Sequence, residues 1–195
     1  MRKPILLIDM DCILVNMLPY WLDIYNEMSG ENISSKDITE YEIRNFVKEP
    51  DLFDKILHEE GFFTNMKPMP GAVKYMRKLI EEGFDIVILT QPPRKSAYAV
   101  KEKTDWLGKY FPEYDPANIV FCHRKELIDG DILFDDKPAH LVDWKKYHPR
   151  GTTITIEYPY NKDAPADVRF ANQRNAWREF YELMSKNISS DSDDS

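Results

Sequence analysis

Cysteine, basic residues and long apolar runs are scarce in this sequence, and each scarcity argues against a class of protein. Only Cys12 and Cys122 occur among the 195 residues, which argues against a disulfide scaffold and favours a reducing, cytoplasmic compartment. No apolar run approaches the roughly 20 residues of a membrane helix, so we expect no membrane partner. The N-terminus reaches Asp9 too soon for a signal peptide.

Basic residues are outnumbered by acidic ones. The 26 Lys and Arg residues stand against 34 Asp and Glu residues, so the formal net charge is −8. This balance argues against binding a nucleic-acid polymer, which needs a basic face. A phosphorylated small molecule would need a metal ion and a few local Lys or Arg residues, because the overall field repels anions.

Short apolar runs alternate with amphipathic segments along most of the chain, which is typical of α/β proteins. The apolar share of 43% is that of a globular protein that can bury a core. We expect strands at residues 5–8, 84–89, 118–121, 131–134 and 152–156. We expect helices at residues 17–28, 51–60, 72–82, 96–111 and 176–184. This order predicts a doubly wound, Rossmann-like, mostly parallel sheet flanked by helices.

The first two strands are separated by a long helical and aromatic-rich segment. We interpret residues 17–67 as a small helical cap inserted into a core domain made of residues 1–16 and 68–188. Residues 189–195 contain only Ser and Asp, so we expect a disordered acidic tail that buries nothing.

The sequence also predicts where individual side chains lie. In the helix expected at residues 96–111, apolar spacing places Val100, Thr104, Leu107 and Phe111 on the buried side. The histidines show no metal-ligand spacing, and we expect them at the surface or in loops. They are His58, His123, His140 and His148.

Three expected strands end in polar residues of complementary kinds. Asp9 and Asp11 follow the first strand, Thr90 the second, and Asp135 and Asp136 the fourth. Carboxyl ends of parallel strands share one edge of a sheet, so these groups should meet around one crevice, within reach of Lys125. Carboxylates suit a divalent cation, while hydroxyl and ammonium groups suit an anion. Each residue taken alone also fits a solvated turn or a surface position.

These residues resemble the motifs of the haloacid dehalogenase superfamily. The stretch DMDCILVN resembles its first motif, Thr90 in ILTQPP the second, Lys125 the third, and ILFDDKP the fourth. Within the superfamily, the chain resembles the 5'(3')-deoxyribonucleotidase family. The similar features are the early insertion, the return segment GFFTNMKPMPGA, and the spacing of Lys125 and Asp136.

The resemblance implies a Mg²⁺-dependent phosphomonoesterase. Asp9 would attack phosphorus to form an aspartyl-phosphate, and Asp11 would act as general acid and then general base. The resemblance implies three metal ligands and a nearby supporting carboxylate: Asp9, the backbone carbonyl of Asp11, Asp136, and Asp135 in support. It also implies a set of phosphate-binding residues: Thr90, Lys125 and Arg94.

The chain departs from the family pattern at two positions in the first motif. Cys12 stands where the family usually has Gly, and Asn16 where it usually has Asp. Cysteine has a Cβ atom, so a left-handed backbone would be unfavourable there. We therefore expect residue 12 to have a negative φ or to carry some strain.

Residues of the insertion are candidates to line a slot for a nucleobase. Met17, Tyr41, Phe62 and Phe63 are the apolar and aromatic residues proposed for this role. Packing within the insertion is an alternative for Tyr41, Phe62 and Phe63, because aromatic residues usually form the core of such a unit.

The hypothesis is a 5'-nucleotidase for deoxyribonucleoside 5′-monophosphates, of which dTMP and dUMP are the expected pyrimidine substrates. One alternative is a phosphatase with the same chemistry and another small phosphomonoester substrate. A second is a catalytically idle nucleotide-binding protein. A homodimer is compatible with the sequence, which leaves the oligomeric state open.

Overall fold

A six-stranded parallel sheet forms the centre of the protein, in the order β3-β2-β1-β4-β5-β6. The computed structural model describes residues 2–189, without the side chains of residues 187–189. The strands are β1 (Ile5–Ile8), β2 (Asp85–Thr90), β3 (Ile119–Phe121), β4 (Ile132–Phe134), β5 (Thr152–Ile156) and β6 (Val168–Phe170). This arrangement confirms the predicted doubly wound, mostly parallel α/β fold. The sequence did not predict the short edge strand β6.

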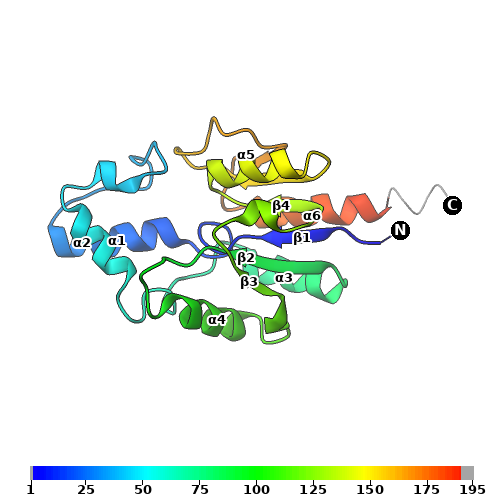
Figure 1. Cartoon of the computed structure of the whole chain (residues 1–195), viewed down its shortest axis with the longest axis horizontal. Coiled ribbons are helices and arrows are strands. Elements are labelled where there is room, and N and C mark those ends of the chain that lie inside the picture. Colours follow the sequence, from blue (N-terminus) through cyan, green and yellow to red (C-terminus); the bar gives the residue numbers. More distant parts are fainter. Residues whose placement is uncertain (1, 190–195) are drawn as a thin grey trace.

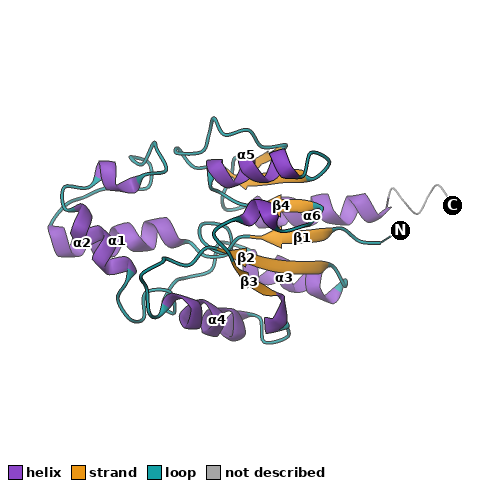
Figure 2. Ribbon diagram, in the orientation of Figure 1, coloured by secondary structure: helices purple, strands orange, loops and turns teal. Residues whose placement is uncertain are grey.

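Helices cover both faces of the sheet (Figures 1 and 2). They are α1 (Met17–Ser29), α2 (Pro50–Leu57), α3 (Ala72–Glu81), α4 (Ala99–Tyr110), α5 (Pro138–Tyr147) and α6 (Ala176–Ser189). Side chains alternate along β1, so Ile8 joins the apolar cluster that contains α3 and α6. Leu7 faces the other way and packs with Trp144 of α5. Among residues 2–189, no helix is long and apolar enough to cross a membrane.

The register of the sheet brings the polar strand ends together. Ile8 at the end of β1 pairs with Ile88 in β2 and with Phe134 at the end of β4. Asp9 and Asp135, which follow these ends, therefore lie at the same edge as Thr90. The backbone N–H of Asp9 donates to the carbonyl of Phe134 across 2.9 Å and continues the strand pairing by one residue.

Helices α1 and α2 lie beyond this edge, at the left in Figure 1. They pack on each other: the indole of Trp21 stacks on Phe53 with ring centres 3.8 Å apart. Trp21 Nε1 also donates to the carbonyl of Phe53 at 2.9 Å. These contacts join α1 to α2 next to the carboxyl edge of the sheet, and Trp21 and Phe53 belong to the same apolar cluster as Ile8.

Helix α4 is rotated relative to the sequence-based prediction. Val100, expected on the buried side, is 47% exposed. The buried side instead contains Glu102, Lys103 and Trp106, while Leu107 and Phe111 are buried as expected. The prediction was wrong for Val100 because two charged residues lie on the buried face, and charged residues add nothing to an apolar pattern.

Helix α6 extends beyond its expected end at Met184 and reaches Ser189, the first residue of the expected tail. The remaining residues of that tail lie outside the part of the chain that the structure describes.

Candidate active site

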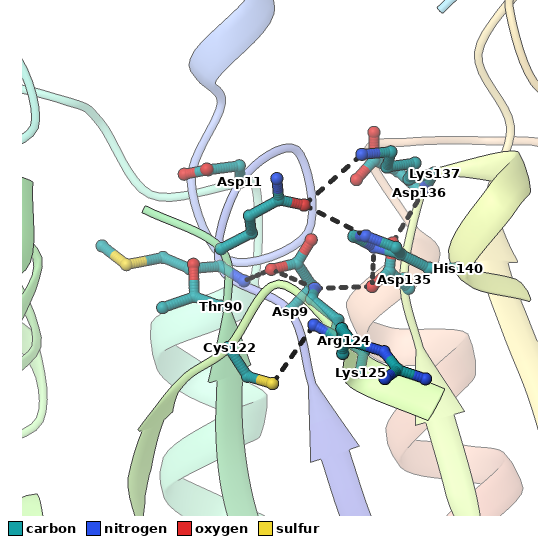
Figure 3. A network of polar contacts seen from close by, with 12 residues as sticks. Asp9, Asp11, Thr90, Cys122, Arg124, Lys125, Asp135, Asp136, Lys137 and His140 are labelled. Atoms are coloured by element: carbon teal, nitrogen blue, oxygen red, sulfur yellow. Dashed lines mark hydrogen bonds and ion pairs between the residues drawn. The ribbon is translucent and has the colours of Figure 1, made fainter. Parts of the chain in front are cut away.

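Asp9 and Asp11 leave β1 together and line one crevice of about 360 Å³ between the sheet edge and the insertion. Asp136 lines the same crevice from the other side, at the end of β4. Figure 3 shows Asp9 beside Asp135 and Lys125, with Asp136 nearby, whereas the side chain of Asp11 is directed away from them. The three strand ends that the sequence selected therefore meet, as the predicted topology required.

Lys125 is fully buried and connects two of these carboxylates. Its Nζ lies 2.8 Å from Asp9 Oδ1 and 2.6 Å from Asp135 Oδ2. Burial lowers the pKa of Lys125, but the charges of Asp135 and Asp9 outweigh burial and raise it above its ordinary value. Burial also disfavours ionised Asp135, yet Lys125 and His140 hold the pKa of Asp135 below its usual range. Lys125 is thus a fixed ammonium group behind Asp9.

Lys103 is a second buried ammonium group, which the sequence did not single out. Its Nζ donates to Asp11 Oδ2 at 2.6 Å and to Thr90 Oγ1 at 2.8 Å. The same Nζ lies 5.0 Å from the ring centre of Phe63. A lysine that follows a glutamate on a helix is an ordinary surface pattern, so the sequence holds no local signal for this role.

Asp136 is almost fully buried and has a neighbour that the sequence also did not reveal. The hydroxyl of Tyr160 donates to Asp136 Oδ2 at 2.5 Å, and Asn161 Nδ2 donates to the Asp136 carbonyl at 2.9 Å. Burial and the nearby charges of Asp135 and Asp9 raise the pKa of Asp136 well above its usual value. Burial likewise raises the pKa of Asp9 to about 6, despite the opposing effect of Lys125. Burial therefore disfavours the ionised form of both carboxylates, and a nearby positive charge would offset this effect.

The carboxylate oxygens of this site are suited to binding a cation. Four carboxylates meet only two buried ammonium groups here, so negative charge is in excess. Asp11 Oδ1 is buried and has no hydrogen-bond partner in the described part of the chain. A buried carboxylate oxygen without a partner is unfavourable unless a cation or a proton binds it. Oxygen ligands of this kind suit a hard divalent ion.

His140 corrects an expectation: it lies in the site and not at the surface. Its Nδ1 is 3.1 Å from Asp135 Oδ2, and its Nε2 is 3.1 Å from Gln91 Oε1. Ligand atoms of Asp9, Asp135 and His140 lie within 4.8 Å of one another, which is a second possible grouping for a metal ion. Lys125 already compensates Asp135 and Lys103 already pairs with Asp11, however, so Asp136, whose carboxylate is bonded only by the neutral hydroxyl of Tyr160 among the described residues, has the greater need for a cation.

Cys12 has a φ of 57°, so the expected negative φ is wrong and the alternative, strain, applies. This is the left-handed region that residues with a Cβ atom rarely adopt. The hydroxyl of Tyr158 donates to the Cys12 carbonyl at 2.8 Å, and the Cys12 side chain is buried. These contacts hold the turn between Asp11 and α1 without the glycine that is usual in the family.

The expected substrate-binding residues fall into two groups. Met17, Tyr41 and Arg94 line the crevice. Arg94 lies in the loop before α4, because the helix begins only at Ala99. Phe62 and Phe63 are buried within the insertion, where Phe62 packs on Tyr20 at 5.4 Å between ring centres. Thr90 and Lys125 are fully buried behind the carboxylates.

Sequence comparison places the chain among nucleotidases. The sequence profile described as "5' nucleotidase, deoxy (Pyrimidine), cytosolic type C protein" matches residues 3–188. A 5'(3')-deoxyribonucleotidase of Clostridium acetobutylicum is 34% identical over 172 residues, which cover 87% of this chain and 90% of the relative. A 5'(3')-deoxyribonucleotidase of Bacillus subtilis is 25% identical over 170 residues, which cover 87% of this chain and 94% of the relative.

Structure comparison supports the same fold. A crystal structure of a HAD-superfamily hydrolase from Ehrlichia chaffeensis superposes with a TM-score of 0.55 at 14% identity, and covers 96% of this chain and 99% of that one. Apo phosphoserine phosphatase superposes with a TM-score of 0.53 at 17% identity, and covers 93% of this chain and 98% of that one. At these identities the likeness concerns the fold alone.

Proposed function

Because the chain belongs to the family of deoxy (pyrimidine), cytosolic type C 5' nucleotidases, we propose that it hydrolyses deoxyribonucleoside 5′-monophosphates such as dTMP and dUMP. The observation that carries this proposal is the meeting of Asp9, Asp11 and Asp136 at one sheet edge, backed by two buried ammonium groups. The residues proposed as nucleophile, proton donor and anion-binding groups lie near one another, which supports phosphoryl transfer.

Asp9 is the proposed nucleophile. Its Oδ1 accepts from the Met10 N–H at 2.7 Å and contacts Lys125, so Oδ2 is the oxygen left to attack phosphorus. Attack forms an aspartyl-phosphate and breaks the bond between phosphorus and the sugar oxygen. Lys125 restrains Asp9 and places positive charge behind it, while the hydroxyl of Thr90 and the guanidinium of Arg94 are proposed to bind the phosphate.

Asp11 is the proposed general acid and base. Lys103 fixes Oδ2, which leaves Oδ1 to give a proton to the departing sugar oxygen. The same oxygen then takes a proton from the water that attacks the aspartyl-phosphate, so phosphate leaves and Asp9 is restored.

Mg²⁺ is the proposed cofactor. Asp9, the Asp11 carbonyl and Asp136 would hold it, with Asp135 as a supporting residue, and when bound it would neutralise charge on the phosphate oxygens. The excess of carboxylates over ammonium groups supports this assignment.

The remaining expectations are part of the proposal. We propose that residues 17–67 form a cap over the core domain of residues 1–16 and 68–188, and that Met17 and Tyr41 contact the nucleobase; both line the crevice. Burial leaves packing within the insertion as the role that the structure favours for Phe62 and Phe63. A cytoplasmic location agrees with the word "cytosolic" in the family description, and homodimer formation stays a proposal.

A phosphate-release assay tests the proposal. Phosphate should be released from dTMP and dUMP faster than from ribonucleotides and sugar phosphates, and EDTA should stop the reaction. Asp9→Asn should abolish turnover while circular dichroism shows an intact fold. Equal rates across the panel would point to another phosphomonoester, and dNMP binding without turnover in excess Mg²⁺ would point to an idle binding protein.

A further inference from the structure

The segment that follows β5, residues Tyr158–Asn161, contacts two of the motifs that line the crevice. Tyr158 donates to the carbonyl of Cys12 at 2.8 Å, and Tyr160 donates to Asp136 Oδ2 at 2.5 Å. The two phenol rings are stacked, with centres 5.1 Å apart and planes 8° from parallel. We call residues Tyr158–Asn161 the tyrosine bracket, since it contacts the turn after β1 and the end of β4 together.

The tyrosine bracket is held rigidly from the side of the core. The side chain of Asn161 donates to the carbonyls of Asp136 and Ile156, at 2.9 and 3.0 Å, and accepts from the Tyr158 N–H at 2.9 Å. Arg169 donates to the Asn161 carbonyl at 3.0 Å. Asn161 is 1% exposed, so these bonds form in a dry environment where an unmade bond would be unfavourable. The Tyr160 hydroxyl is thus presented from a fixed backbone.

We propose that Tyr160 is a positioning residue that orients the Asp136 carboxylate for metal binding. The proposal rests on the proposed function, in which Asp136 is a metal ligand. The Tyr160 hydroxyl makes the one side-chain hydrogen bond to the Asp136 carboxylate in residues 2–186, so it restricts rotation of that group. Oδ1 is then the oxygen left to face the crevice. Partners that orient a ligand in this way affect metal affinity strongly, by about 10- to 100-fold when removed.

The ring of Tyr160 has a separate role in joining the core to the insertion. Tyr41 packs edge-on against it, with ring centres 5.7 Å apart and planes at 79°. Lys137, a residue that follows β4, places its Nζ 5.0 Å from the centre of the Tyr41 ring. Tyr160→Phe keeps the ring and removes only the hydroxyl, so it separates the hydrogen bond to Asp136 from the contact with Tyr41.

Metal binding without substrate tests the proposal. Calorimetric titration with Mg²⁺, or Mn²⁺ binding followed by electron paramagnetic resonance, gives a dissociation constant that does not depend on turnover. We expect Tyr160→Phe to weaken binding by about tenfold or more. Tyr25→Phe is the matched control, because Tyr25 is also buried and its hydroxyl also bonds a carboxylate, Glu31 at 2.7 Å, but within the insertion. The control should bind the metal like the unmodified protein.

The outcomes separate this proposal from the proposed function. Unchanged or tighter metal binding by Tyr160→Phe would overturn the role of Tyr160 and leave the proposed function standing. If the unmodified protein binds no divalent ion, the metal assignment fails, and the role of Tyr160 fails with it. In an Asp136→Asn background, Tyr160→Phe should have no further effect, and a further loss there would also count against the proposal. Should Tyr160→Phe not fold, Tyr160→Leu removes the hydroxyl together with the ring, and its metal affinity is compared with that of Tyr41→Leu, which removes only the ring contact; equal affinities would overturn the role of the hydroxyl.

Discussion

The ammonium group of Lys103 lies 2.6 Å from the carboxylate of Asp11, although 92 residues separate them in the chain. The same ammonium group donates to Thr90 at 2.8 Å. Helix α4 thus connects the ends of β1 and β2 through one buried side chain. In the proposed mechanism, this contact decides which oxygen of Asp11 faces the reacting bond.

Replacing Lys103 with Met should lower kcat more than it raises KM. Methionine keeps much of the volume but leaves Asp11 without its partner, so the general acid loses its orientation. General acid–base catalysis contributes about 10²–10⁴-fold, and we expect a loss near the lower end. Steady-state kinetics on dTMP measures it. Lys101→Met, which removes an exposed lysine paired with Asp105, is the control and should keep wild-type kinetics. An unchanged kcat in Lys103→Met would exclude this role for Lys103.

Substitutions at Cys12 should reveal the strain of its left-handed backbone. Cys12→Ala loses the sulfur and keeps the Cβ atom, whereas Cys12→Gly loses both and tolerates a φ of 57°. The left-handed conformation costs a residue with a Cβ atom about 1–2 kcal/mol. We therefore expect Cys12→Gly to be more stable than Cys12→Ala by about 1 kcal/mol in urea denaturation. The strain is refuted if Cys12→Ala is at least as stable as Cys12→Gly.

Mg²⁺ should raise the melting temperature of the protein over its value in EDTA. An ion that binds only the folded state stabilises it by about 2.7 kcal/mol at a concentration of 100 times Kd. Scanning calorimetry in Mg²⁺ and in EDTA measures the shift. Asp136→Asn should abolish most of it, because the variant lacks a proposed ligand. Equal melting temperatures with and without Mg²⁺ would contradict a site in the folded protein.

Glu102→Gln should destabilise the protein, although Glu102 has no role in the proposed reaction. The Glu102 carboxylate accepts from the backbone N–H of Gly61 at 2.6 Å and of Phe63 at 3.0 Å. A glutamine amide offers one acceptor, so one buried N–H would face another donor, at a cost of about 1–3 kcal/mol. Glu59→Gln, at an exposed position, is the control and should stay within about 0.5 kcal/mol. Equal unfolding free energies for both variants would show that Glu102 does not anchor the return segment of the insertion.

The sequence by itself determined strands β1 to β5 and the meeting of the ends of β1, β2 and β4. Apolar runs such as Ile5–Ile8 predict buried strands locally, and alternation with helices predicts parallel pairing. Once the strands are parallel, Asp9, Thr90 and Asp136 must come to one edge, whatever the details of packing. Lys125, which the sequence placed within reach of the same crevice, lies against Asp9 and Asp135.

Only the tertiary structure decided which polar residues outside those motifs are buried. Lys103, His140 and Tyr160 each lie against a carboxylate of the site, and none shows this in its local sequence. Apolar periodicity reports burial because burying apolar surface is favourable anywhere in a core. A buried charge or hydroxyl is stable only beside a particular partner, and that partner comes from a distant part of the chain. The predicted buried face of α4 was wrong for this reason. The observed buried face includes Glu102 and Lys103, whose partners come from distant parts of the chain.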